Sequence, residues 1–223
     1  MPLLRLFFPL CLLCSLASTT VIAAQDTEPE LNKAQKLIFL GEHLRQTAPG
    51  QTLVYAFTSN VNGQATKSDE VKMTVTGVVD DARRDLAFEF LSGDDRMNFP
   101  DAHGYRGNPI VVQFLERDIR DMSRQTGTPI AYLRNTIRRA FAAPQINETR
   151  VEVAGNDVDA TEITVLPFAT DANLAEFEGV AGKEYRFVYS EQIPGDLVSV
   201  RTRMSAADGT MLKEEGLRYG GIR

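Results

Sequence analysis

Hydrophobic and polar residues alternate along two stretches of the chain, one on each side of a central helical region. In the first stretch, three segments place apolar residues at every second position, the pattern of half-buried β-strands. These segments contain Leu53, Tyr55 and Phe57; Val71, Met73, Val75, Gly77 and Val79; and Leu86, Phe88 and Phe90. Turn-forming residues separate them, so the pattern predicts an antiparallel meander with one apolar face.

The C-terminal third of the sequence shows the same alternation in five further segments. They are marked by Val151 and Val153; Ile163 and Val165; Tyr185, Phe187 and Tyr189; Val198, Val200, Thr202 and Met204; and the stretch 211–219. Pro194-Gly195-Asp196 and Asp208-Gly209 are typical of hairpin turns between the last three segments. About eight strands are predicted in all.

Three segments follow a helical period instead. The first runs from about residue 30 to 46 and is apolar on more than one side, because Phe39 and Leu40 lie off its main stripe. The other two begin at Asn108-Pro109 and Thr128-Pro129, a capping or hydroxyl residue followed by proline. They end near residues 125 and 143, and the short link between them predicts an antiparallel helical hairpin.

The order of one helix, three strands, two helices and five strands predicts the α+β class. We expect a strongly curved antiparallel sheet that resembles a half-barrel, with the N-terminal helix and the central helical hairpin packed on one side. One domain is expected over residues 30–223. The stretch 92–107, rich in Gly, Asp and Asn, is predicted to be a loop.

The first 24 residues have the organisation of a cleavable signal peptide: Arg5, an apolar run from Leu6 to Ala17, and small residues before the expected cleavage site. The run is shorter than the ~20 residues of a membrane-spanning helix. Both cysteines lie within it, so the mature protein is expected to lack thiols, which favours a bacterial periplasm. We expect a flexible leader over 25–29 and a periplasmic or secreted protein without a stable membrane span. A retained anchor and a lipidated cysteine are the alternatives.

The formal net charge of −6 argues against a nucleic-acid partner, because binding to phosphates needs a basic surface. Seven arginines are nevertheless concentrated between positions 117 and 150. Neighbouring acidic residues indicate a solvated, charge-balanced face there, and an anionic partner is the alternative.

The sequence contains no motif for catalysis, a cofactor or a metal. His43 is expected to be a solvated residue of the first helix, and His103 lies near Asp94, Asp95 and Asp101 without a metal-binding spacing. No Gly-x-Ser-x-Gly nucleophile motif occurs. A carboxylate pair that only the fold brings together stays open, because it leaves no local signature. We therefore expect a non-enzymatic protein without cofactor or metal.

The predicted helix that begins at Asn108-Pro109 has a wide apolar arc, and Asp118 points into its middle. A buried carboxylate requires a partner. Arg134 and Arg138, at the edge of the next helix's apolar stripe, are the predicted partners. A salt bridge that fixes the hairpin is the first interpretation, and a polar anchor inside an apolar cavity is the second.

Two resemblances add to this picture. The block from Gly107-Asn108-Pro109 through Phe114-Leu115-Glu116-Arg117-Asp118 and Met122 to Thr126-Gly127 resembles a family of uncharacterised secreted proteobacterial proteins, which implies no activity. The predicted order of elements is similar to that of the periplasmic carriers of outer-membrane lipoproteins, open half-barrels whose apolar concave face is covered by helices. This second resemblance implies a lipid-like ligand or an envelope protein as the partner.

These observations favour a protein that binds an apolar ligand or a carrier partner in the concave face of its sheet. The candidate ligand-binding residues are Asp118, Arg134, Arg138, Phe39, Phe88, Phe90, Tyr185, Phe187 and Tyr189. An empty cavity of about several hundred Å³ under the helices would support this hypothesis, and a filled core would argue against it. An interaction or assembly module of a cell-envelope complex and an enzyme of unrecognised type are the alternatives.

Overall fold

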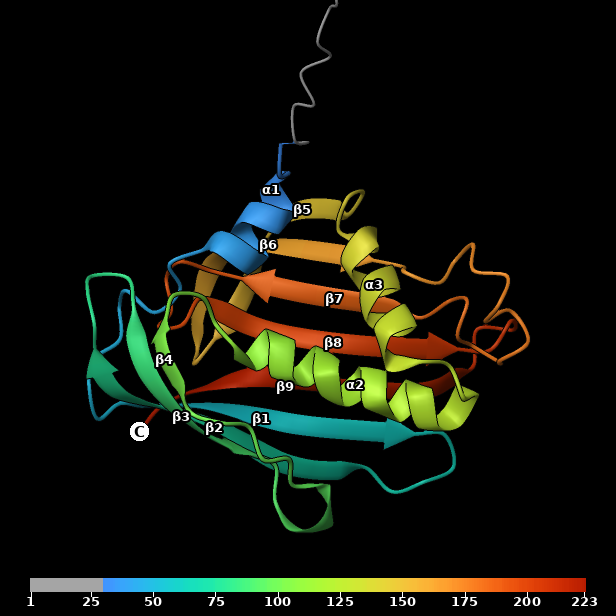
Figure 1. Cartoon of the computed structure of the whole chain (residues 1–223), viewed down its shortest axis with the longest axis horizontal. Helices are drawn as coiled ribbons and strands as arrows, with labels where there is room; N and C mark the ends of the chain where they lie inside the picture. The colour runs from blue at the N-terminus through green and yellow to red at the C-terminus, as the bar shows by residue number, and fades with distance from the viewer. Residues whose placement is uncertain (1–29) are drawn as a thin grey trace, which may run out of the picture. The chain divides into compact units, whose positions relative to one another are not determined.

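Nine antiparallel strands form one curved sheet in the computed structural model, which describes residues 30–223 (Figure 1). Their bounds are β1 Thr52–Val61, β2 Lys67–Val78, β3 Arg84–Phe90, β4 Ala102–Tyr105, β5 Gln145–Val153, β6 Asn156–Val165, β7 Glu184–Tyr189, β8 Leu197–Ser205 and β9 Met211–Ile222. The structure confirms the predicted α+β class and the half-barrel-like sheet with its helices on one side. The predicted signal peptide, 1–24, and leader, 25–29, lie outside the described residues.

The strand order is β4-β3-β2-β1-β9-β8-β7-β6-β5, so the pairing of β1 with β9 joins two meanders. In that pair Tyr55 lies opposite Tyr219 and Phe57 lies opposite Leu217. The register shifts between Val54 and Tyr55, and β2 has a similar irregularity against β3. Such irregularities bend strands and increase their twist, which gives the sheet its curvature.

The prediction that residues 92–107 form a loop is wrong at 102–105, which form the strand β4. The sheet therefore has nine strands rather than about eight. This strand pairs with β3 through Arg84 opposite Tyr105 and Leu86 opposite Ala102. It lies at an edge of the sheet and consists of Ala-His-Gly-Tyr. A four-residue edge strand buries little surface, so it shows too little alternation for a strand to be predicted.

The first helix is shorter than the predicted 30–46. It consists of α1, Lys33–Gln35, and a π-helical turn η1, Lys36–Leu40, and the chain leaves the helix at Gly41. A Cβ atom on Gly41 would lie 2.1 Å from Nε2 of His43. The absence of a side chain at this position therefore lets the chain turn back and place His43 beneath it.

The two central helices are α2, Ile110–Thr126, and α3, Ile130–Ala140. Gly127 adopts φ 69°, the left-handed conformation that commonly ends a helix and that glycine adopts without strain. Figure 1 shows α2 lying along the central strands, whereas α3 crosses β7 and β8 toward β6 rather than running back beside α2. The two helices thus cover different parts of the concave face.

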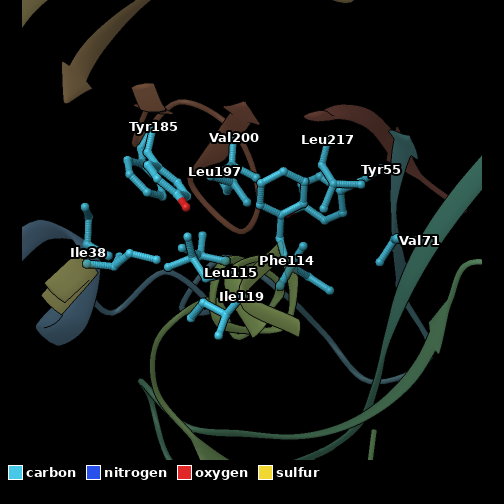
Figure 2. Packing of buried hydrophobic residues seen from close by; sticks show 14 of the residues in the cluster. Ile38, Tyr55, Val71, Phe114, Leu115, Ile119, Tyr185, Leu197, Val200 and Leu217 are labelled. Atoms are coloured by element: carbon cyan, nitrogen blue, oxygen red, sulfur yellow. The ribbon is translucent and has the colours of Figure 1, made fainter. Parts of the chain in front are cut away.

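Apolar side chains of the helices and of the concave face form one core. Figure 2 shows Phe114 and Leu115 of α2 directed toward the strand residues Tyr185, Val200 and Leu217. These residues are all buried. Helix side chains therefore fill the concave face. Among the described residues, no helix is long and apolar enough to cross a membrane.

Candidate functional site

A buried ion pair lies beneath the middle of α2. Asp118 is 2% exposed, as the apolar arc of its helix predicts. Its Oδ1 accepts a hydrogen bond from Nζ of Lys183 at 2.6 Å, and its Oδ2 accepts one from the Tyr185 hydroxyl at 2.6 Å. Burial, reinforced by the negative charge of Asp118, raises the pKa of Tyr185 well above its usual value. The phenol therefore stays protonated and donates to the carboxylate at any ordinary pH.

The predicted partners of Asp118 are wrong. Arg134 pairs with Glu116 near the surface at 2.8 Å, and the side chain of Arg138 is exposed. The apolar side of α3, with Leu133 and Ile137, is buried, so Arg134 meets α2 only at its surface residue Glu116 and does not reach Asp118. Asp118 consequently finds its cation on the sheet and not on the neighbouring helix.

Lys183, the cation of this buried ion pair, was not among the residues that the sequence pattern singled out. It immediately precedes β7 and lies two positions before Tyr185, in the same every-second-residue series as Phe187 and Tyr189. Side chains at every second position of an extended segment share a face. Extending the aromatic row by one step would have placed a lysine on the concave face, opposite the inward-facing carboxylate.

A second ionic group joins α2 to β9. Glu215 is buried and accepts hydrogen bonds from Arg117 and Lys213, at 3.0 Å in both cases. Lys213 also pairs with Asp121. Burial tends to raise the pKa of Glu215, but the charges of Lys213 and Arg117 outweigh it and hold that pKa below its usual value. The group therefore remains ionised, and α2 is attached to the sheet by charge pairs at Arg117, Asp118 and Asp121.

The predicted aromatic residues occupy two regions of the core. Phe88 and Phe90 lie on β3, where Phe90 packs edge-on against Phe99 with centroids 5.2 Å apart. Phe187, on β7, lies 5.5 Å from the Phe141 ring at the end of α3. The structure does not bring these two regions together into one site.

Three of these rings form a row that runs from the surface into the core. The Phe39 ring on η1 packs edge-on against Phe141 at 5.2 Å, and Phe141 contacts Phe187. Phe39 is 44% exposed, Phe141 is 1% exposed and Phe187 is fully buried. The apolar interior therefore reaches solvent between η1 and the end of α3.

A hollow of about 250 Å³ lies beside Phe39, bordered by Tyr105 and Val112. Both of these residues and Leu40 are also exposed. The core residues Phe88, Phe90, Tyr185 and Phe187 do not line this hollow or the four other main hollows of residues 30–223. A filled concave face argues against a preformed ligand chamber there.

His43 is not the solvated helix residue that the sequence predicts, because the helix ends before it. It is 1% exposed, its Nε2 donates to the Leu37 carbonyl at 2.8 Å, and its Nδ1 accepts the Asn108 N–H at 3.0 Å. Burial lowers the pKa of His43, although the bond to Leu37 opposes this. Its neutral ring packs against Tyr189 with centroids 5.1 Å apart.

The Asn108 side chain connects three parts of the fold: β1, the turn between β7 and β8, and the start of α2. Its Nδ2 donates to the Tyr55 hydroxyl and to the Gly195 carbonyl, each at 2.8 Å, and its Oδ1 accepts the Ile110 N–H at 3.2 Å. Gly195 adopts φ 81°, and a Cβ there would lie 2.4 Å from Leu53 Cδ2. This close approach lets the turn between β7 and β8 reach Asn108.

Asp196, at the end of that turn, carries a perturbed carboxyl group. Burial, with a contribution from the negative charge of Glu191, raises its pKa from 3.8 to about 7. The folded protein therefore binds this proton more tightly than the unfolded chain. The stability that the protonated group contributes is present at acidic pH and is lost as the pH rises through 7.

Replacing Asp196 with asparagine should consequently raise Tm at pH 8, and the gain should shrink at pH 5.5, where the native carboxyl is already neutral. Asparagine tolerates the left-handed backbone of this position, φ 54°, so the turn is retained. Asp157→Asn, the same change of charge at an exposed site, is the control and should give no such pH dependence. A lower Tm for D196N at pH 8 would contradict the prediction.

The surroundings of His103 bear on the question of a metal site. His103 is exposed, and its Nδ1 lies 3.7 Å from Oδ1 of Asp85, which is not one of the three acidic residues named beside it in the sequence. Over residues 30–223, no three His, Cys, Asp or Glu side chains are placed to hold a metal ion.

No protein-family model matches the chain, and no curated protein matches it. Among solved structures, it is similar to the Mycobacterium tuberculosis lipoprotein LppX, with 9% identity, a TM-score of 0.33 and coverage of 85% of this chain and 95% of that one. A LolA superfamily protein from Nitrosomonas europaea has 9% identity, a TM-score of 0.22 and coverage of 85% and 92%. A candidate outer membrane lipoprotein-sorting protein domain from Vibrio parahaemolyticus has 12% identity and a TM-score of 0.24. The match covers 82% of this chain and 88% of that one. The name of the third agrees with the resemblance to proteins that handle outer-membrane lipoproteins, but identities and TM-scores this low give no information about the activity of this chain.

Proposed function

We propose that the protein is a non-enzymatic binding protein of the periplasm that takes up an apolar, lipid-like chain between the concave face of its sheet and the covering helices. The row of rings Phe39, Phe141 and Phe187 carries this proposal. It connects solvent with the concave face through apolar contacts. An acyl chain that enters along this row would keep contacts with apolar side chains at every step, first with Phe39 and then with Phe141 and Phe187.

The ligand must displace side chains of the helices, because these fill the concave face. The segment best placed to move is η1, a single π-helical turn next to a three-residue helix. Such turns are rare and often occur at functional sites. Asn32 joins this segment to the end of α3 by hydrogen bonds from Nδ2 to the carbonyls of Phe141 and Ala142, at 2.8 and 3.2 Å. Their loss would separate η1 from α3 and open the row of rings.

The test is a titration with cis-parinaric acid, a fatty acid whose fluorescence rises in apolar surroundings. We expect saturable binding by the wild-type protein. Phe39→Glu should weaken it about tenfold, because an aromatic contact of about 1–2 kcal/mol is lost. The control is Leu40→Glu, the same change at an adjacent exposed residue, which should stay within about twofold of wild type. Absence of saturable binding, or equal losses in both variants, would contradict the proposal.

One observation favours a second function, an interaction surface for an envelope protein. Phe39, Leu40 and Val112 expose 44–50% of their surfaces, and Tyr105 lies with Phe39 and Val112 around the same hollow. Native mass spectrometry of the protein purified from its own envelope separates the two functions. A bound lipid mass lost in F39E supports uptake of an apolar chain, whereas a protein partner lost in both F39E and L40E supports the surface function.

A further inference from the structure

The turn between β7 and β8 holds two carboxylates beside a buried phenol. The Ser190 N–H donates to the Asp196 carbonyl at 2.8 Å, and the Asp196 N–H donates to the Ile193 carbonyl at 3.1 Å. These bonds close the turn and fix Asp196 next to the end of β7. Tyr189 is the last residue of that strand.

The Tyr189 hydroxyl is buried and makes no hydrogen bond with any described residue, although Tyr189 is only 2% exposed. A buried hydroxyl without a partner costs about 1–3 kcal/mol, so natural structures rarely leave one unsatisfied. Burial, followed by the neighbouring Tyr55 and Asp196, raises the pKa of this phenol. The hydroxyl is therefore neutral and close enough to Asp196 to sense its charge.

Two hollows meet at this turn. One, of about 260 Å³, is lined by Tyr189 and Leu37, and the other is about 320 Å³; Asp196 and Glu191 line both. The charged and titratable groups around the turn are Glu42, His43, Arg45, Tyr55, Glu148, Asp159, Tyr189, Glu191 and Asp196.

Most of these acids already have cationic partners. Glu148 pairs with Lys33, Asp159 pairs with Arg150, and Glu42 pairs with Arg45 and Arg106. Within residues 30–223, the carboxylates of Asp196 and Glu191 make no ion pair and no hydrogen bond. Two carboxylates without partners thus line both hollows, and the buried Tyr189 hydroxyl, which also lacks a partner, lies near Asp196.

We propose that the two hollows form one binding site for a primary ammonium group, which the carboxylates of Asp196 and Glu191 and the hydroxyl of Tyr189 hold. An ammonium group has three N–H donors and no acceptor, so it matches three oxygens that lack partners. A divalent metal matches them less well, since calcium takes six to eight oxygen ligands. The Leu37 side of the smaller hollow would contact a short alkyl chain attached to the nitrogen.

The test is calorimetric titration of the purified protein with n-butylammonium chloride at pH 8.5. We expect saturable binding with a Kd of about 1 mM, a value typical of one small charged group. Asp196→Asn and Glu191→Gln should each weaken it at least about tenfold. Asp159→Asn removes an acid that lines the same hollow but is paired with Arg150, and it should leave the affinity within about twofold.

At pH 5.5 binding should be about thirtyfold weaker, because only the ionised fraction of a carboxyl group with a pKa of about 7 is competent. Butanol at the same concentration should produce no heat of binding. A D196N protein with wild-type affinity, or equal heats from sodium chloride at matched ionic strength, would overturn the proposal. Binding of calcium chloride without binding of butylammonium would also overturn it, in favour of a metal site. Circular dichroism verifies that each variant is folded.

Lysine side chains and ethanolamine head groups both carry a primary ammonium group. Nα-acetyl-lysine amide and glycerophosphoethanolamine, each in competition with butylammonium, distinguish these sources. Whichever competes at the lower concentration identifies the natural class of ligand, and failure of both at about 50 mM, far above the expected Kd, would contradict the site.

Discussion

Replacing Asp118 with alanine should lower the free energy of unfolding by about 3–5 kcal/mol, a large part of the stability of a typical domain. The variant leaves Lys183, 2% exposed, as a charge without a partner beneath α2. It also removes the acceptor of the Tyr185 hydroxyl. Urea denaturation followed by circular dichroism measures the loss, since the chain contains no tryptophan for fluorescence.

The pairing itself is tested by the double variant Asp118→Leu with Lys183→Met. Two apolar side chains of similar volume remove both buried charges, so most of the lost stability should return. Glu116→Ala is the control on the same helix, because its ion pairs with Arg120 and Arg134 are nearer the surface and should be worth about 0–1 kcal/mol. If the double variant is no more stable than D118A, the ion pair is not the source of the effect.

Asn108→Ala should cost about 2–4 kcal/mol, because it breaks bonds to three parts of the fold at once. The Tyr55 hydroxyl and the Gly195 carbonyl lose their donor, and the N–H of Ile110, the first residue of α2, loses its side-chain acceptor. The same urea experiment measures this effect. Hydrogen exchange should show the turn between β7 and β8 opening more often than β1.

The matched control is Asn147→Ala, an asparagine exposed on β5 with no side-chain hydrogen bond to another described residue. Its stability should stay within about 0.5 kcal/mol of wild type. A loss of similar size at both positions would show that Asn108 acts through local backbone preference rather than through its bonds.

Features that depend on nearby residues could be predicted from the sequence. The alternation around Tyr55 and around Phe187 reports directly on one buried face, so the long strands were identified. The inward position of Asp118 follows from helical geometry in the same way. The helix boundary near Gly41 could not be predicted, because it depends on the burial of His43 by residues distant in sequence.

The candidate sites depend more strongly on long-range contacts. Lys183 lies 65 residues from Asp118, and sequence spacing suggested arginines on the neighbouring helix instead. The pattern at Asn108-Pro109 predicted the start of a helix, although the N-cap is Pro109 and not Asn108, and the bond from Asn108 to Gly195 spans 87 residues. The unpaired Asp196 and Tyr189 come together only when the turn after β7 is closed, and nothing in the local sequence distinguishes them from ordinary turn and core residues.

The central pairing of β1 with β9 has a consequence for folding kinetics. The strands β1 to β4 touch the other five only through β9, which begins at Met211. The backbones of Thr52 and Arg223 exchange two hydrogen bonds of 2.9 Å, the contact of greatest sequence separation in the sheet. Closing so long a loop is slow, and until it happens β1 and β8 each present an unpaired edge. Folding of this chain should therefore be limited by the arrival of its last strand, and the period before that step is when the chain is most exposed to aggregation.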